Sequence, residues 1–365
     1  MTDLPADNAR IARSGSSPDA FPEGTLTDER LSHLVRLLGD NAMLVVSGTK
    51  IAEELGVSRS EVWRLIEQLR ELGVQIQGHP ATGYQLGAIP DLLLPDALAP
   101  LVKGTLFAND IHHYFRIGST NVAAMQAGAA GEPEGSVFLA EEQTAGKGRG
   151  GHSWHSAESA GIYCSVLLRP RVSPADALIL ALAAGVATAD AVSSITGLKA
   201  DLRWPNDLLF GMKKFCGILT ELNAEATRVR YVVIGIGINV NHAEFPEEIH
   251  KVATSLCLQS GRTWSRVELT AALLKSLDRT YSELLRGGAE ARRAVIARFQ
   301  EMSSLAKERR VFVEEDGGYA GISAGLDDRG FLQVTSNHAL RTVFSGGVRA
   351  IEDVDGIRQL RHGDF

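Results

Sequence analysis

The sequence predicts an α+β chain in three parts: an N-terminal winged helix-turn-helix, a central mixed sheet with helices, and a small C-terminal β-barrel or sandwich. Three observations support this order. Helical periodicity and a short hairpin pattern fill the region before residue 90. Strand and helix patterns then alternate as far as residue 305, and short strands separated by turn residues follow to the end. The 365 residues are enough for two or three domains.

Composition excludes several classes of protein. A hydrophobic content of 44% and a charged content of 22% are those of a globular chain and exclude a disordered or fibrous one. The net charge of −7 gives no overall basic surface for nucleic acid. The three cysteines are widely spaced, which predicts reduced thiols and no disulfide framework or zinc site.

No segment predicts a membrane span or a signal peptide. The most apolar stretch, 177–189, is shorter than the ~20 residues that a spanning helix needs, so we expect a buried helix there. These features predict a cytoplasmic protein that has no membrane partner.

Residues 1–24 are rich in Pro, Ser, Asp and Ala and predict a mobile tail. Residues 25–90 form the first predicted domain. Ala52, Gly56 and Val62 have the spacing of a helix-turn-helix, in which a small residue allows close crossing and glycine makes the turn. Ser58, followed three residues later by Glu61, predicts a capping box at the start of the second helix.

That second helix exposes side chains able to reach phosphates and base edges. The predicted DNA-binding residues are Ser58, Arg59, Ser60, Trp63 and Arg64. The domain nevertheless carries six Lys/Arg against eight Asp/Glu, and DNA-binding surfaces are usually basic. The sequence therefore leaves two roles open, a DNA-binding domain and a structural partner of the rest of the chain.

Residues 91–305 form the second predicted domain. Strands are expected at 112–117, 136–142, 161–169, 202–210, 215–222 and 230–240, helices at 120–130 and 173–195, and two amphipathic helices within 266–305. Residues 306–365 form the third, with short strands between turns.

The most informative segment is the glycine-rich loop at 146–151. Its glycines fit a GxGxxG pattern, but no helical periodicity follows and no acidic residue ends a second strand, so we reject a dinucleotide-binding fold. Glycines let backbone N–H groups approach a ligand closely, and Lys147 and Arg149 add positive charge. The loop therefore predicts a mobile, basic cover for a phosphate or carboxylate.

Other segments carry polar residues that suit a ligand site. The turn 118–121 offers hydrogen-bonding side chains before a helix. Asn206 and Asp207 lie at a break after Pro205, and Lys214 enters an apolar strand, where a lysine is costly without an anionic partner. Asn239 ends a strongly apolar strand.

The motifs GSTN, EEQTAGKGRGGHSW, RWPNDLLF…KKFCGIL and GIGINVN, in this order, resemble those of the biotin protein ligases. With the winged helix in front and the small β domain behind, the chain resembles the bifunctional ligase/biotin-operon-repressor type over residues 26–362. The resemblance implies a biotin/lipoate ligase-like central domain and an SH3-like C-terminal barrel.

The resemblance also implies two half-reactions. Biotin and ATP, with Mg²⁺ arriving on ATP and no dedicated metal site, give biotinoyl-5′-AMP and pyrophosphate. The adenylate then acylates a lysine on the biotin carboxyl carrier domain of acetyl-CoA carboxylase. It implies operator DNA as a second partner, and it leaves homodimerisation open.

The resemblance assigns roles by motif. It implies Arg149, Lys214 and Asp207 as catalytic residues, with Asp207 either taking the acceptor lysine's proton or orienting it. The implied biotin-binding residues are Ser119, Thr120, Asn121, Gln143, Lys147, Gly148, Arg149 and Lys214. The implied ATP-binding residues are Trp154, His152, Asn206 and Asn239.

The loop departs from the family pattern, because Gly150 and His152 stand where arginine is common. Cys216 stands where alanine is common. Two other functions stay open: a lipoate-type ligase with the same core fold, and a non-catalytic, metabolite-responsive transcription regulator. Intact Arg149 and Lys214 argue against the regulator.

Overall fold

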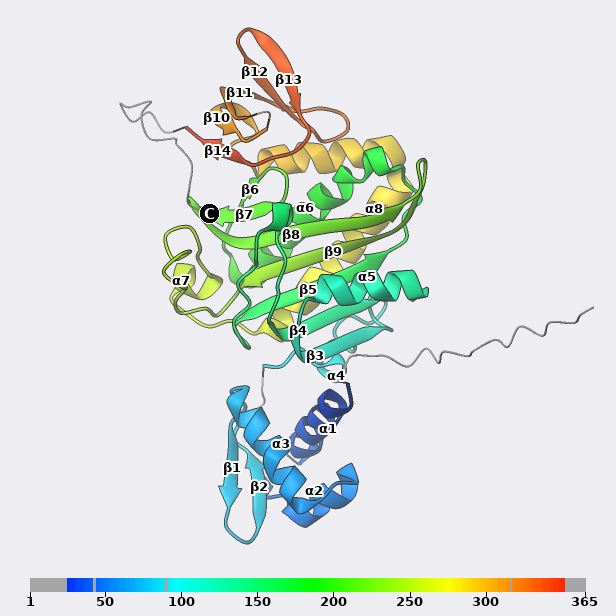
Figure 1. Cartoon of the computed structure of the whole chain (residues 1–365), viewed down its shortest axis with the longest axis vertical. Coiled ribbons are helices and arrows are strands. Elements are labelled where there is room, and N and C mark those ends of the chain that lie inside the picture. Colours follow the sequence, from blue (N-terminus) through cyan, green and yellow to red (C-terminus); the bar gives the residue numbers. More distant parts are fainter. Residues whose placement is uncertain (1–24, 42–43, 89–90, 316, 352–365) are drawn as a thin grey trace, which may run out of the picture.

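The computed structural model describes residues 25–41, 44–88, 91–315 and 317–351. The predicted mobile tail, 1–24, lies outside the described residues, as does the C-terminal segment 352–365. Figure 1 shows a helical N-terminal domain below a central sheet, with a small β domain above it.

The N-terminal domain is a winged helix-turn-helix. Its elements are α1 (Thr25–Asp40), α2 (Gly48–Leu55), α3 (Arg59–Glu71), β1 (Ile76–His79) and β2 (Gly83–Leu86). Ala52 and Val62 are buried, and Gly56 takes the left-handed conformation that turns the chain between α2 and α3. Ser58 accepts the Glu61 N–H as predicted, whereas the Glu61 carboxylate is bonded by Arg64.

The central domain is a mixed sheet in the order β3-β4-β5-β9-β8-β7-β6. Its strands are β3 (Ile111–Ile117), β4 (Val137–Gln143), β5 (Gly161–Leu168), β6 (Asp201–Arg203), β7 (Asp207–Phe210), β8 (Lys213–Ala224) and β9 (Val229–Asn239). The β3–β4 pair is parallel and the other pairs are antiparallel.

Helices cover both faces of this sheet. The buried helix α6 (Leu178–Thr196) and the long α8 (Arg266–Glu301) pack on one face, and α5 (Thr120–Ala130) packs on the other (Figure 1). Short helices α4 (Pro95–Leu98) and α7 (Leu256–Ser260) lie at the margins. The segment Pro174–Thr196 is long and apolar enough for a membrane span, but it is mostly buried inside this domain, as the sequence predicted.

One predicted strand is divided, at the break that the sequence indicated after Pro205, and two predicted helices are joined end to end. The strand expected at 202–210 is two short antiparallel strands, β6 and β7, joined through a cis Trp204–Pro205 peptide. The reason is that proline has no N–H to give to a ladder, and the Asn206 side chain instead donates to the Ile218 carbonyl. The two helices expected within 266–305 meet at Gly288, whose backbone is non-helical.

The C-terminal domain is an antiparallel sheet in the order β13-β12-β11-β10-β14. Its strands are β10 (Lys307–Val313), β11 (Tyr319–Leu326), β12 (Leu332–Ser336), β13 (Ala339–Val343) and β14 (Val348–Ala350). Because β13 and β14 form the two edges among the described residues, the closed barrel that we predicted is not confirmed.

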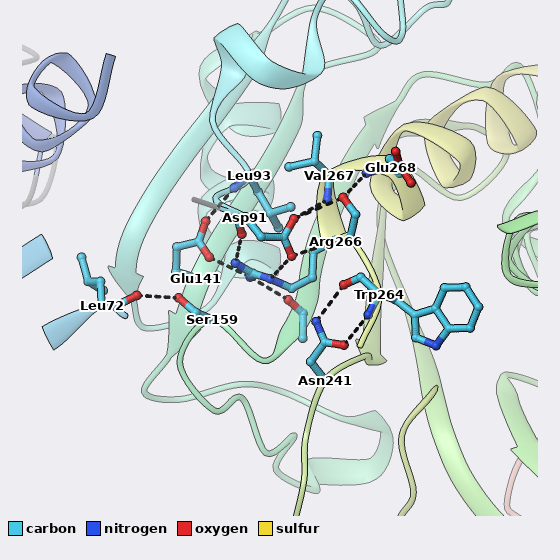
Figure 2. Close-up of polar contacts among 12 residues, drawn as sticks. Leu72, Asp91, Leu93, Glu141, Ser159, Asn241, Trp264, Arg266, Val267 and Glu268 are labelled. Carbon is cyan, nitrogen blue, oxygen red and sulfur yellow. Dashed lines mark hydrogen bonds and ion pairs between the residues drawn. The ribbon is translucent and has the colours of Figure 1, made fainter. Parts of the chain in front are cut away.

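The segment 91–94, which follows the winged domain, contacts the hydrophobic cores of both the winged domain and the central domain. Leu92 packs in the core of the winged domain and Leu93 in the core of the sheet domain, since successive side chains of an extended segment point in opposite directions. The Leu93 N–H donates to the Glu141 carboxylate on β4 at 2.8 Å, as Figure 2 shows.

A buried arginine completes this junction. Arg266, at the start of α8, lies 2.7 Å from Glu141 and donates to the Gly161 carbonyl, and the Asp91 carboxylate accepts its backbone N–H (Figure 2). Burial raises the pKa of Glu141, but Arg266 and His113 outweigh burial and hold that pKa at about 2. The junction is therefore a charged pair that has no access to water.

We predict that Arg266→Met lowers the free energy of unfolding by about 3–5 kcal/mol, because it leaves the Glu141 carboxylate buried without its cation. Urea unfolding of the full chain measures this. The control is Arg230→Met, which removes an exposed partner of Glu225 and should cost less than about 1 kcal/mol. Equal losses in the two variants would contradict the account.

Candidate functional site

A pocket opens on the α5 face of the sheet because three positions there lack side chains. Along a strand alternate residues share a face, so Gly235 and Gly237 of β9 and Gly217 of β8 lie on the side that α5 covers further along. The pocket encloses about 440 Å³ of empty space, including its opening.

Trp154 fills one part of this hollow. Gly237 of β9 and Gly217 of β8 are partners across the two strands. A Cβ at Gly237 would lie 2.5 Å from the Trp154 indole, and a Cβ at Gly217 would lie 2.9 Å from it. The indole therefore lies directly on the backbone of the two strands. The Lys214 ammonium lies 5.3 Å from the centre of the indole ring, within range of a cation–π contact.

At the other end of the pocket, Asn121 lies on the backbone of β9, as Trp154 lies on the backbone of β8 and β9. A Cβ at Gly235 would lie 2.0 Å from its Oδ1, so glycine is required beneath it. Thr120 and Asn121 form the first turn of α5, which begins at the residue that the sequence predicted. Ser119 holds the N-cap position, its side chain makes no capping bond, and the residue lines the pocket.

A hydrogen-bond network connects these polar residues. The Gln143 carbonyl oxygen accepts the Thr120 N–H at 2.9 Å and the Thr120 hydroxyl at 3.1 Å, and its amide donates to Ser156. The buried Ser165 hydroxyl contacts Thr120 at 2.8 Å and Asn121 at 2.6 Å. This end of the pocket therefore presents fixed, uncharged hydrogen-bonding groups.

The glycine-rich loop is folded over the pocket as a narrow hairpin. Gly148 N–H donates to the His152 carbonyl at 2.7 Å, and Trp154 N–H donates to the Gly146 carbonyl at 2.9 Å. Gly150 at the tip takes a positive φ, which glycine tolerates best. Arg149 donates to the Gly346 carbonyl, so the tip contacts the C-terminal domain.

Opposite the polar end, a cation is held by a half-buried carboxylate. Lys214 on β8 lies 2.7 Å from Asp207 on β7, whose other oxygen accepts from Arg203 at 2.9 Å. Burial raises the pKa of Asp207, but Lys214 and Arg203 outweigh burial and keep that pKa below its ordinary value. The lysine thus has the anionic partner that its sequence position requires.

The structure brings most of the predicted site residues together. The pocket wall includes all eight predicted biotin-binding positions and two of the nucleotide-binding ones: Ser119, Thr120, Asn121, Gln143, Lys147, Gly148, Arg149, Lys214, Trp154 and Asn206. Asp207 lies behind Lys214. His152 is exposed on the loop and is not part of the wall.

Asn239 also lies outside the pocket wall, and its amide donates to the Thr254 carbonyl. Thr254 in turn donates its N–H to the Lys214 carbonyl, so Asn239 supports the segment beside the lysine. Its buried Oδ1 has no hydrogen-bond partner in the described part of the chain.

Several residues of the site escaped the sequence analysis. Tyr163 and Cys164 line the wall, and Ser165 and Glu221 contact Asn121. The alternation along 161–168 could have placed 163 and 165 on one face. Nothing in the sequence pairs Asn121 with a residue 100 positions away. Among the described residues, no group of three or more His, Cys, Asp or Glu could hold a metal ion.

The predicted DNA-binding side chains share an exposed surface of α3. Ser58, Arg59, Ser60, Trp63 and Arg64 are all exposed, and Trp63 is 59% exposed, which is high for an aromatic residue. Arg64 is bonded to Glu61, so part of its charge is compensated.

Comparison with known proteins finds matches for both the central domain and the N-terminal domain. Residues 116–239 match the biotin/lipoate A/B protein ligase family, and residues 30–85 match a helix-turn-helix domain. A bifunctional ligase/repressor of Bacillus subtilis is 32% identical over 86% of this chain and 97% of its own. A biotin–[acetyl-CoA-carboxylase] ligase of Mycobacterium tuberculosis is 35% identical over 59% and 79%.

A solved structure agrees with the sequence comparison. The biotin protein ligase of Aquifex aeolicus, in complex with biotin and ATP, aligns with a TM-score of 0.57 and 28% identity. The alignment covers 66% of this chain and 98% of that chain.

We predict a pH dependence from His242, which lies 3.4 Å from the Tyr163 hydroxyl of the pocket wall. Burial and the nearby His155 and Arg266 lower its pKa from 6.5 to about 4. Between these pH values the unfolded chain binds the proton and the folded chain does not. The free energy of unfolding should therefore fall by about 3 kcal/mol as pH drops from 6.5 to 4.

Urea unfolding across this pH range tests the prediction with His242→Phe, which keeps the stacking on Phe245 and should show a shallower slope. The exposed His250→Phe is the control and should keep the parent slope. If His242→Phe leaves the slope unchanged, this histidine does not cause the pH dependence.

Proposed function

The chain belongs to the biotin protein ligase family, of the bifunctional ligase/repressor type, and from this we propose how its pocket joins biotin to ATP and then to an acceptor lysine. It is an ATP-dependent biotin ligase with a repressor-type helix-turn-helix domain. The residue assignment rests on one observation: a single pocket has an uncharged polar end and a cationic end. The polar end is formed by Thr120, Asn121 and Gln143, and the cationic end by Lys214 and Arg149.

The two ends suit the two ends of biotin. The fixed amides and hydroxyls match a neutral head group that both donates and accepts hydrogen bonds, and the cations match a carboxylate. In the first step a biotin carboxylate oxygen attacks the α-phosphorus of ATP, and pyrophosphate leaves. Lys214, Lys147 and Arg149 lower the barrier by stabilising the negative charge that these groups bring together.

In the second step the amine of an acceptor lysine attacks the acyl carbon, and AMP leaves. We propose that Asp207 positions Lys214 and does not take the acceptor's proton, because two cations lower its pKa and make it a weak base. The glycine-rich loop holds the labile adenylate away from water.

The nucleotide is proposed to lie beside Trp154 and Asn206, with His152 and Asn239 near it. Mg²⁺ is proposed to enter on the phosphates of ATP. The proposed acceptor is the biotin carboxyl carrier domain of acetyl-CoA carboxylase, and the name of the Mycobacterium tuberculosis relative gives acetyl-CoA carboxylase as the protein it acts on. We propose a cytoplasmic location without a membrane partner, and a homodimer as one possible assembly.

We propose that the functions divide among residues 25–90 for DNA, 91–305 for ligation and 306–365, an SH3-like fold, for support of the loop. The contact of Arg149 with Gly346 supports the last of these. Operator DNA is the proposed second partner, bound through Ser58, Arg59, Ser60, Trp63 and Arg64 on α3.

We predict that Lys214→Ala lowers biotin-dependent ATP–pyrophosphate exchange by about 100-fold or more, since it removes a fixed cation from the reacting groups. Biotin should still bind, as measured by calorimetry. The control is Lys213→Ala, which removes an exposed ammonium one residue away and should leave exchange unchanged. Near-normal exchange in Lys214→Ala would refute the role of its charge.

We predict that Arg59→Ala with Trp63→Ala weakens binding to the DNA upstream of this chain's own coding sequence by at least tenfold, with biotinoyl-AMP present. Ligation should be unaffected. Fluorescence anisotropy measures the affinity, with Arg36→Ala on α1 as the control. If the parent chain shows no affinity for this DNA, the winged domain acts only as a structural partner.

A further inference from the structure

The orientation of the Asn121 side-chain amide depends on an acidic side chain. Its Nδ2 donates to the Glu221 carboxylate at 2.8 Å, and its Oδ1 accepts from Ser165 at 2.6 Å. Glu221 lies on β8, a half-buried position on the same face as Gly217 and Leu219. The two residues are 100 positions apart in the chain.

This contact removes an ambiguity that every asparagine carries. A side-chain amide can turn by 180° and exchange its donor and acceptor ends with little change in shape. An ionised carboxylate only accepts hydrogen bonds, so the NH₂ end of Asn121 must face Glu221. The carbonyl end then faces Ser165, which is fully buried.

At the other end of this hydrogen-bond network, the orientation of the Gln143 side-chain amide is fixed by a backbone donor. The Thr120 backbone N–H only donates, so the carbonyl oxygen of Gln143 must face it. Ser165 lies between the two amides and contacts both Thr120 and Asn121. With Asn121 Oδ1 as an acceptor, the Ser165 hydroxyl donates to it, and the single hydrogen of the Thr120 hydroxyl goes either to Ser165 or to Gln143. Glu221 therefore sets the arrangement of donors and acceptors on the Asn121 side.

We propose that Glu221 is a positioning residue for substrate selection: by fixing the Asn121 amide it sets the pattern of donors and acceptors that the head group of biotin meets. The inference rests on the proposed function of this pocket. Glu221 acts through Asn121 and not on the reacting carboxylate, since its contact is with the uncharged end of the pocket.

The proposal predicts a selective kinetic effect. Glu221→Ala should raise the KM for biotin about tenfold, the size expected for one lost charge-assisted hydrogen bond, and should leave kcat and the KM for ATP within about twofold. Ser165→Ala should act in the same direction. Glu225→Ala, which removes an exposed carboxylate just beyond β8, should change none of these values.

A double-mutant cycle separates positioning from a general structural effect. In the Asn121→Ala background there is no amide left to orient, so adding Glu221→Ala should change the KM for biotin by less than about twofold. The measurement is the initial rate of biotin-dependent ATP–pyrophosphate exchange by the full chain. Circular dichroism confirms folding, and Glu221→Leu, which keeps much of the side-chain volume but has no hydrogen-bond acceptor, replaces Glu221→Ala if that variant does not fold.

Three results would overturn the proposal: an unchanged KM for biotin, a parallel loss in kcat and the KM for ATP, or an effect that multiplies with Asn121→Ala. Absence of biotin-dependent exchange in the parent chain would instead overturn the proposed function of the pocket. The two failures are therefore distinguishable.

Discussion

The contact between Lys214 and Asp207 is the interaction on which the rest of the site depends. A half-buried ammonium in an apolar strand is tolerated because a carboxylate on the neighbouring strand lies 2.7 Å away. Asp207 reaches this position because residues 204–206 turn the chain between β6 and β7 and leave Asp207 at the start of β7. Lys214 itself is held by the backbone of residues 252 and 254. The cation is thus fixed before any substrate arrives, which is what stabilisation of a charged transition state requires.

The glycines on β8 and β9 impose the complementary constraint. They are not present for flexibility, since they lie in regular strands, but to let Asn121 and Trp154 rest on the backbone. Side chains at these positions would fill the pocket with atoms and continue the apolar contacts that α5 makes with Val233 and Leu167. The same sheet therefore forms a core under α5 and a binding site beside it.

Sequence reasoning identified the parts of this protein that are local in the chain. The spacing of Ala52, Gly56 and Val62 predicted the helix-turn-helix, and the four ordered motifs predicted most of the pocket wall. It missed what depends on contacts between distant segments. The residue types indicated a break after Pro205, but the periodicity along 202–210 does not reveal that the strand folds back there as a hairpin. Nothing local pairs Glu141 with Arg266 or Asn121 with Glu221. The C-terminal barrel, which the short strands and the family resemblance predicted, is not confirmed, since the described strands pair as a sheet with β13 and β14 at its edges.

The most direct test of the central claim is the choice of acid by the parent enzyme. ATP–pyrophosphate exchange should be measured with biotin, lipoate and octanoate at equal concentrations. The account predicts exchange with biotin alone, because the polar network at Thr120, Asn121 and Gln143 has no partner on a simple alkyl chain. Comparable exchange with lipoate or octanoate would contradict it, since the cationic end of the pocket would then select only a carboxylate.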